Sequence, residues 1–102
     1  MKSDVVKAVL QDELERNQRL VSRYEKELEN LPKGSIYKRK IGNHEYLYLN
    51  YREGNKVVSK FLGKNEMFDS DELKMQLDKR NEYKQLIKKL KLEQKDLLKA
   101  LK

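Results

Sequence analysis

Residues 35–64 read SIYKRKIGNHEYLYLNYREGNKVVSKFLGK. The pattern of this segment determines the predicted fold. Polar and apolar side chains alternate in it, and Tyr, Val, Ile and Leu are frequent, as is typical of β-strands. Two pairs, Gly42-Asn43 and Gly54-Asn55, interrupt the alternation. Gly-Asn fits the centre of a type II′ turn, whose first residue needs a positive φ. The segment predicts three antiparallel strands, over residues 35–41, 44–52 and 57–62.

The sequences on both sides of this segment have a helical pattern. Residues 4–31 contain neither Pro nor Gly, and their apolar residues recur at alternating spacings of four and three. This spacing predicts a helix with one apolar seam, which Pro32 ends because proline lacks an amide donor. Residues 69–72 resemble a capping box, and residues 70–101 again contain neither Gly nor Pro. They predict a second helix with a matching seam.

The two seams predict how the helices pair. We expect an antiparallel coiled coil, with Leu14 near Leu90 and Val21 near Tyr83. Asn17 is a polar seam position, and such residues usually set the register of a helix pair. The same seams also fit pairing with a second copy, which would give a homodimer through the helices. The fold class is therefore α+β, a single domain of residues 1–102 with a three-stranded antiparallel sheet (35–62) inserted between helices 4–31 and 70–101, in the order α–βββ–α.

The composition excludes several classes of function. The 102 residues suit one domain, and without Cys the chain forms no disulfide or thiolate metal site. No apolar run is long enough to span a membrane and no signal peptide is evident, so we expect a cytoplasmic protein without membrane contact. His44 is the only histidine, and the glycines form no phosphate-binding loop. We therefore expect no metal, no cofactor and no enzymatic activity.

The net charge of +7 is unevenly distributed. Residues 32–64 carry 8 basic and 2 acidic side chains, a net charge of +6. A charge needed only for solubility would be spread over the chain, whereas a concentrated one is typical of a surface that binds a polyanion.

The two faces of the predicted sheet differ. With two-residue turns, three Tyr and Phe61 share one face with Arg39 and Arg52, while the other face is aliphatic and carries Lys38, Lys40 and Lys60. We expect helix to cover the aliphatic face, with its lysines reaching the rim. Two alternatives remain open: the aromatic face is the core, or a bulged second turn moves Val57, Ser59 and Phe61 to the other side.

An exposed sheet with Tyr, Arg and Asn has the chemistry of a nucleic-acid reader. Tyr stacks on bases, Arg binds phosphate or guanine, and Asn binds adenine. The candidate nucleic-acid-binding residues are Lys38, Arg39, Lys40, Tyr46, Tyr48, Asn50, Arg52, Lys56 and Lys60. A secondary basic stripe on the last helix is formed by Lys84, Lys88, Lys91 and Lys95. It fits the path of a phosphate backbone, although such stripes are more often solvated helix faces.

A resemblance to known proteins adds a biological setting. The segment LPKGS at 31–35, with YLYLNYREGNKVVSKFLGK at 46–64, resembles a family of short bacterial proteins found with phages, transposons and integrative elements. The sheet is similar in kind to the three-stranded DNA-binding domains of integrases and transposases, although the long flanking helices differ from theirs. The resemblance implies DNA, rather than RNA, as the partner. The residues that it implies face DNA are Arg39, Tyr46, Tyr48, Asn50, Arg52, Lys56 and Lys60.

A mobile-element origin also implies a second role, in which the protein is an interaction module. It would then bind a protein or a nucleoprotein complex, for example as a phage-encoded inhibitor of a host defence nuclease, in the manner of anti-CRISPR proteins.

Overall fold

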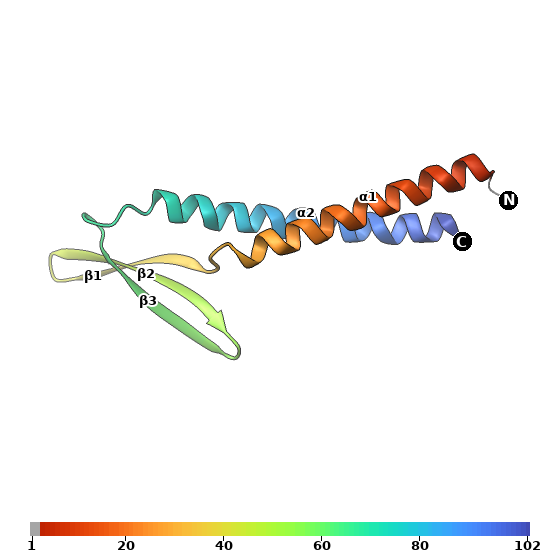
Figure 1. Ribbon diagram of the computed structural model, residues 1–102. Coiled ribbons are helices and arrows are strands. Elements are labelled where there is room, and N and C mark those ends of the chain that lie inside the picture. The colour runs from red at the N-terminus through yellow and green to blue at the C-terminus, as the bar shows by residue number, and fades with distance from the viewer. Residues whose placement is uncertain (1–2) are drawn as a thin grey trace. The chain divides into compact units, whose positions relative to one another are not determined.

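The computed structural model describes residues 3–102 and confirms the predicted α–βββ–α order (Figure 1). Each element lies within two residues of its predicted bounds. The elements are α1 (Asp4–Glu29), β1 (Ser35–Ile41), β2 (His44–Glu53), β3 (Lys56–Lys64) and α2 (Asp71–Leu101).

A side chain that precedes each helix accepts a hydrogen bond from an amide of its first turn. Before α1, the Ser3 Oγ accepts a hydrogen bond from the Val6 amide at 3.2 Å. Before α2, Oδ1 of Asp69 accepts one from the Asp71 amide at 3.0 Å. Each bond satisfies an amide that has no partner within the first turn of its helix. None of the helices within residues 3–102 is both long enough and apolar enough to cross a bilayer.

The three strands form one antiparallel sheet in the order β1-β2-β3. Ile41 pairs with His44 across the first turn, and Glu53 pairs with Lys56 across the second. The turn glycines have φ of +64° and +60°, and no described residue other than glycine has a positive φ. Only the first central residue of each turn is left-handed, as a type II′ turn requires. The predicted turns and register are confirmed, and the alternative of a bulged second turn is wrong.

A β-bulge lies at the other end of β3. Tyr48 pairs with Phe61, whereas the preceding residue Leu47 pairs with Gly63, so Leu62 is the extra residue on β3. The insertion reverses the alternation of side chains beyond it. Lys64 therefore pairs with Tyr46 and lies on the same face of the sheet.

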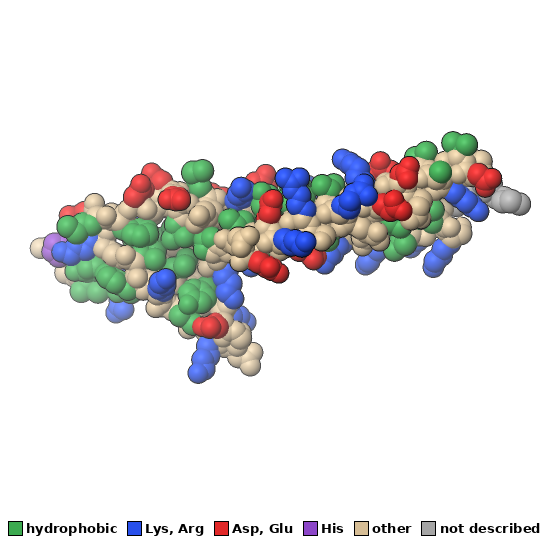
Figure 2. Space-filling view, in the orientation of Figure 1, with side chains coloured by type: hydrophobic (Ala, Val, Ile, Leu, Met, Phe, Trp, Pro, Cys, Tyr) green, Lys and Arg blue, Asp and Glu red, His purple; other side chains and the backbone are tan. Residues whose placement is uncertain are grey.

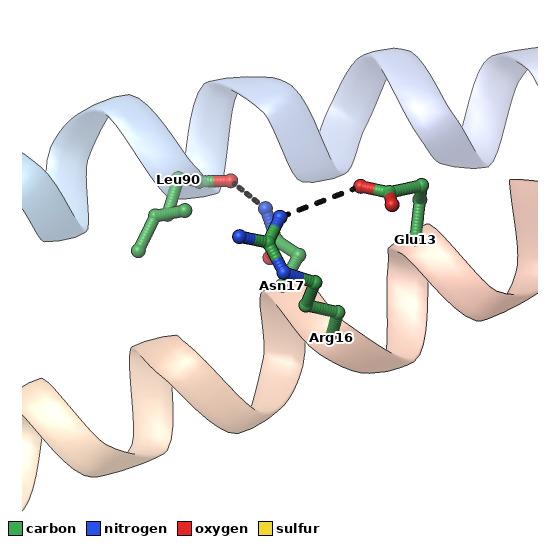
Figure 3. A network of polar contacts seen from close by, with 4 residues as sticks. All are labelled: Glu13, Arg16, Asn17 and Leu90. Carbon is green, nitrogen blue, oxygen red and sulfur yellow. Dashed lines mark hydrogen bonds and ion pairs between the residues drawn. The ribbon is translucent and has the colours of Figure 1, made fainter.

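The chain divides into two compact units, one made of the residues up to Asn30 with Asn81–Lys102, the other of Leu31–Arg80. In the first unit, α1 and the later part of α2 lie side by side and antiparallel. Asn17 Nδ2 donates a hydrogen bond to the Leu90 carbonyl at 2.8 Å (Figure 3), and the rings of Tyr24 and Tyr83 are 5.0 Å apart. Leu14, Asn17, Val21 and Ile87 are buried in this unit.

The observed helix register differs from the predicted one by three residues. Asn17, not Leu14, lies opposite Leu90, and Tyr24, not Val21, lies opposite Tyr83. Because the seams repeat every three and four residues, a slip of three again brings seam positions opposite each other.

In the second unit, the aliphatic face of the sheet is the buried one, as predicted. Leu47 is 1% exposed and Leu49 is 8% exposed, and Leu77 of α2 is also buried. By contrast, Tyr37 and Phe61 on the opposite face are 51% and 56% exposed. The alternative in which the aromatic side chains form the core is therefore wrong.

Candidate nucleic-acid interface

Strand pairing assembles one exposed face from alternate residues of all three strands. We call it the aromatic face because its centre is a row of rings, Tyr37–Tyr48–Phe61, that crosses the sheet. The side chains of this face belong to Ser35, Tyr37, Arg39, Ile41, His44, Tyr46, Tyr48, Asn50, Arg52, Val57, Ser59, Phe61 and Lys64.

The rings of the aromatic face contact one another along β2 and β3. The ring centroids of Tyr48 and Phe61 are 5.5 Å apart at an interplanar angle of 62°, and those of Tyr46 and Phe61 are 6.1 Å apart at 47°. His44 extends the series, 6.4 Å from Tyr46. Tilted contacts at these distances are favourable between aromatic rings. The rings thus contact one another in the free protein, although Phe61 remains more than half exposed.

The charges on the aromatic face are all positive. Arg39, Arg52 and Lys64 are exposed there. The two acidic residues of the strands, Glu45 and Glu53, project from the opposite face because side chains alternate along β2. Glu45 Oε2 accepts a hydrogen bond from Asn65 Nδ2 at 3.1 Å. No carboxylate of the three strands therefore opposes an anion on the aromatic face.

A polar pair lies beside the rings. Ser59 Oγ donates a hydrogen bond to Asn50 Oδ1 at 2.7 Å, across the pairing of β2 with β3. The bond fixes the orientation of the amide and engages its oxygen. The Nδ2 group, a donor, is thus the part of Asn50 that is suited to an acceptor on a ligand.

The structure brings together five of the nine predicted site residues. On the aromatic face these are Arg39, Tyr46, Tyr48, Asn50 and Arg52. The other four are exposed but lie on the opposite face, together with Leu47 and Leu49, because side chains alternate along each strand. These four are Lys38, Lys40, Lys56 and Lys60.

On that opposite face, Lys60 lines a shallow pocket of about 220 Å³ together with Pro32, Lys33, Leu49 and Tyr51. Lys33 Nζ is 6.0 Å from the centroid of the Tyr51 ring, a cation–π distance. Lys60 therefore does not act on the same surface as the two arginines.

Tyr37, Phe61 and Lys64 also lie on the aromatic face, although the sequence-based set did not include them. Tyr37 and Phe61 could have been included, because the predicted register already places them in the aromatic row. Lys64 could not, because it reaches this face only through the bulge at Leu62.

The basic stripe of α2 has a different environment. Lys84, Lys88, Lys91 and Lys95 are all exposed, but Lys91 Nζ lies 3.3 Å from Glu25 Oε1 of α1. Figure 2 shows red acidic side chains interspersed with blue basic ones along the helices. Over the strands it shows green side chains, the colour that apolar residues share with Tyr, bordered mainly by blue Lys and Arg. This environment favours the interpretation of the stripe as a solvated face. Within residues 3–102, no three His, Cys, Asp or Glu side chains cluster in a way that could hold a metal ion.

Comparison with known proteins identifies a family. Residues 10–74 match the domain of unknown function DUF6788, which is more than half of the chain. The chain belongs to the DUF6788 family. The matched region of this DUF6788 protein contains the whole sheet and ends four residues into α2, so it includes every residue of the aromatic face. No curated protein and no solved structure matches the chain.

Proposed function

We propose that this DUF6788 protein is a small nucleic-acid-binding accessory protein of a mobile element that contacts DNA through its aromatic face in the bacterial cytoplasm. One observation carries the proposal. Exposed and half-buried rings lie between Arg39 and Lys64 at one end and Arg52 at the other, on a face without a carboxylate. Cations would bind phosphates, while Asn50 and the rings would contact bases.

The dimensions of the aromatic face suit a polynucleotide. Arg39 and Lys64 both pair with Tyr46, and Arg52 lies six residues further along β2. At a rise of about 3.3 Å per residue, the two positive ends are roughly 20 Å apart. One strand of duplex DNA carries a phosphate every 3.4 Å or so along the axis, so the face could span about six phosphates.

A salt titration tests the proposal. In fluorescence anisotropy with a labelled duplex, the logarithm of the affinity should fall linearly with the logarithm of the salt concentration, because bound cations release counterions. The triple variant Arg39→Gln, Arg52→Gln, Lys64→Gln should bind at least about tenfold more weakly. Its slope should be less steep by about 2 to 3, at roughly 0.9 for each phosphate that the variant no longer neutralises.

The matched control removes the same charge from α2. The control carries Lys84→Gln, Lys88→Gln and Lys95→Gln, at three exposed lysines. It should retain most of the affinity and slope. Equal losses in the two variants would show that net charge, and not the aromatic face, governs binding. No binding of the unmodified protein at low salt, to duplex or single strand, would overturn the proposal.

A second candidate function is a protein-interaction module that inhibits a host defence nuclease. The observation that favours it is apolar exposure on the same face, where Ile41, Val57 and Phe61 are 50%, 69% and 56% exposed. Exposed aromatic and aliphatic groups are typical anchors of protein interfaces. The test is a pull-down from a host lysate whose nucleic acids have been digested. The wild type would retain a host defence nuclease, and the double variant Val57→Ser, Phe61→Ser would lose it. Loss of all partners on nuclease treatment would favour nucleic acid instead.

A further inference from the structure

Phe61 is the least expected side chain on a surface that binds only phosphates. It lies at one end of the row that Tyr48 and Tyr37 continue across the sheet, and it is 56% exposed. Its ring has no donor or acceptor for a phosphate, unlike the tyrosine hydroxyls. The partner that suits an exposed phenyl ring is another flat ring or an apolar group.

Duplex and single-stranded nucleic acids differ in the rings that they present. In a duplex the faces of the bases are stacked on one another, and only their edges are accessible in the grooves. An unpaired strand presents base faces and phosphates together, and proteins bind it by combining aromatic stacking with a basic surface. A row of rings therefore gains more binding free energy from a single strand than from a duplex.

The cations lie where the phosphates of such a strand would pass. Arg39 and Lys64 are in the row next to the central rings, about 7 Å away, and Arg52 lies about 13 Å away on the other side. We propose that the aromatic face selects single-stranded nucleic acid by stacking two or three unpaired bases on Tyr37, Tyr48 and Phe61. This inference rests on the proposed function and specifies its substrate.

Three labelled probes of equal length and phosphate count per strand test the inference: an unmodified single strand, the same sequence as a duplex, and an abasic single strand. The unmodified strand should bind at least about tenfold more tightly than both others, since only it offers base faces. Equal affinity for the unmodified and abasic strands, or tighter binding of the duplex, would overturn the single-strand inference and leave the proposed function standing. Binding to none of the probes would overturn both.

A single substitution separates stacking from charge. Phe61→Leu keeps an apolar side chain but removes the ring, and should weaken binding of the unmodified strand by a factor of about 5 to 100. Its affinity for the abasic strand should not change. The conservative variant Phe61→Tyr should bind the unmodified strand as tightly as the wild type, and Leu92→Ile, at an exposed apolar position of α2 outside this face, should have no effect. Wild-type affinity of Phe61→Leu for the unmodified strand would overturn the inference.

Discussion

At the scale of single residues, Gly34 is the glycine least tolerant of a side chain. It precedes β1 with φ +119°, which side chains rarely allow. A Cβ added there would overlap the Asn50 carbonyl oxygen and lie 3.0 Å from the Tyr51 Cβ. Gly34→Ala should therefore lower the free energy of unfolding by roughly 2 to 4 kcal/mol, measured by urea denaturation.

The control for this prediction is Gly42→Ala. Gly42 also has a positive φ, +64°, but a Cβ there would meet nothing within 4 Å. Gly42→Ala should therefore lower the free energy of unfolding by only about 1 kcal/mol, the cost of the backbone strain. If the two variants were equally destabilised, the close approach of Gly34 to β2 would contribute nothing beyond the φ angle.

At the scale of the strands, local sequence predicts pairing but not the bulge. The two Gly-Asn turns and the alternation determine the register, because a slip of one residue would bury the arginines and expose Leu47. The bulge at Leu62 is followed by a turn at the end of β3. There the amides of Met67 and Phe68 both donate to the Lys64 carbonyl, and Gly63 packs against Phe68. Alternation within β3 contains no sign of this turn, so the position of Lys64 could not be predicted.

At the scale of the helices, spacing predicts the seams but leaves the register undetermined. Heptad positions are equivalent under a slip of three or four residues. The observed register has two specific contacts, the hydrogen bond from Asn17 to the Leu90 carbonyl and the contact between the rings of Tyr24 and Tyr83. Sequence analysis identifies Asn17 as a polar seam residue. Its partner is a backbone carbonyl, however, and no pattern of residues indicates which carbonyl that is.

Asn17 should reduce the stability of the helix pair while helping to determine its register. The residue is 2% exposed, and its Oδ1 has no hydrogen-bond partner. A buried acceptor without a donor costs free energy, so Asn17→Leu should raise the free energy of unfolding by about 1 kcal/mol. Urea denaturation would measure the change.

Gln18→Leu is the matched control for Asn17→Leu, because it makes a similar amide-to-leucine change at an exposed neighbour. It should alter stability by less than about 0.5 kcal/mol. A clear loss of stability in Asn17→Leu alone would contradict the prediction. The bond to Leu90 would then contribute more than a buried leucine side chain does.

At the scale of the whole molecule, the excess positive charge lies in one part of the chain. The helices carry bases and acids in similar numbers, whereas residues 32–64 carry 8 basic and 2 acidic side chains. The strands keep both of their acids on one face and all of their rings except Tyr51 on the other. In the proposed function, net charge would draw a polyanion to the protein from a distance, and the aromatic face would offer the short-range contacts that distinguish one nucleic acid from another.

The mass of the protein in solution tests how the helices pair. One chain already buries Leu14, Asn17 and Val21 of α1 and Ile87 of α2. Because the sheet segment tethers the two helices, each has the other at a high effective concentration. A homodimer built on these seams would exchange the same contacts between chains and lose additional translational and rotational freedom.

We therefore expect a monomer of 12.3 kDa in light scattering across a wide range of protein concentrations, with the helices paired as an intramolecular antiparallel coiled coil. A mass of twice this value that persists on dilution would show that the seams, or the exposed Val5 and Val9 of α1, join two copies. Asn17→Leu separates these two cases. A dimer joined through the seams should become more resistant to dilution in this variant, whereas one joined through the valines should dissociate as the wild type does.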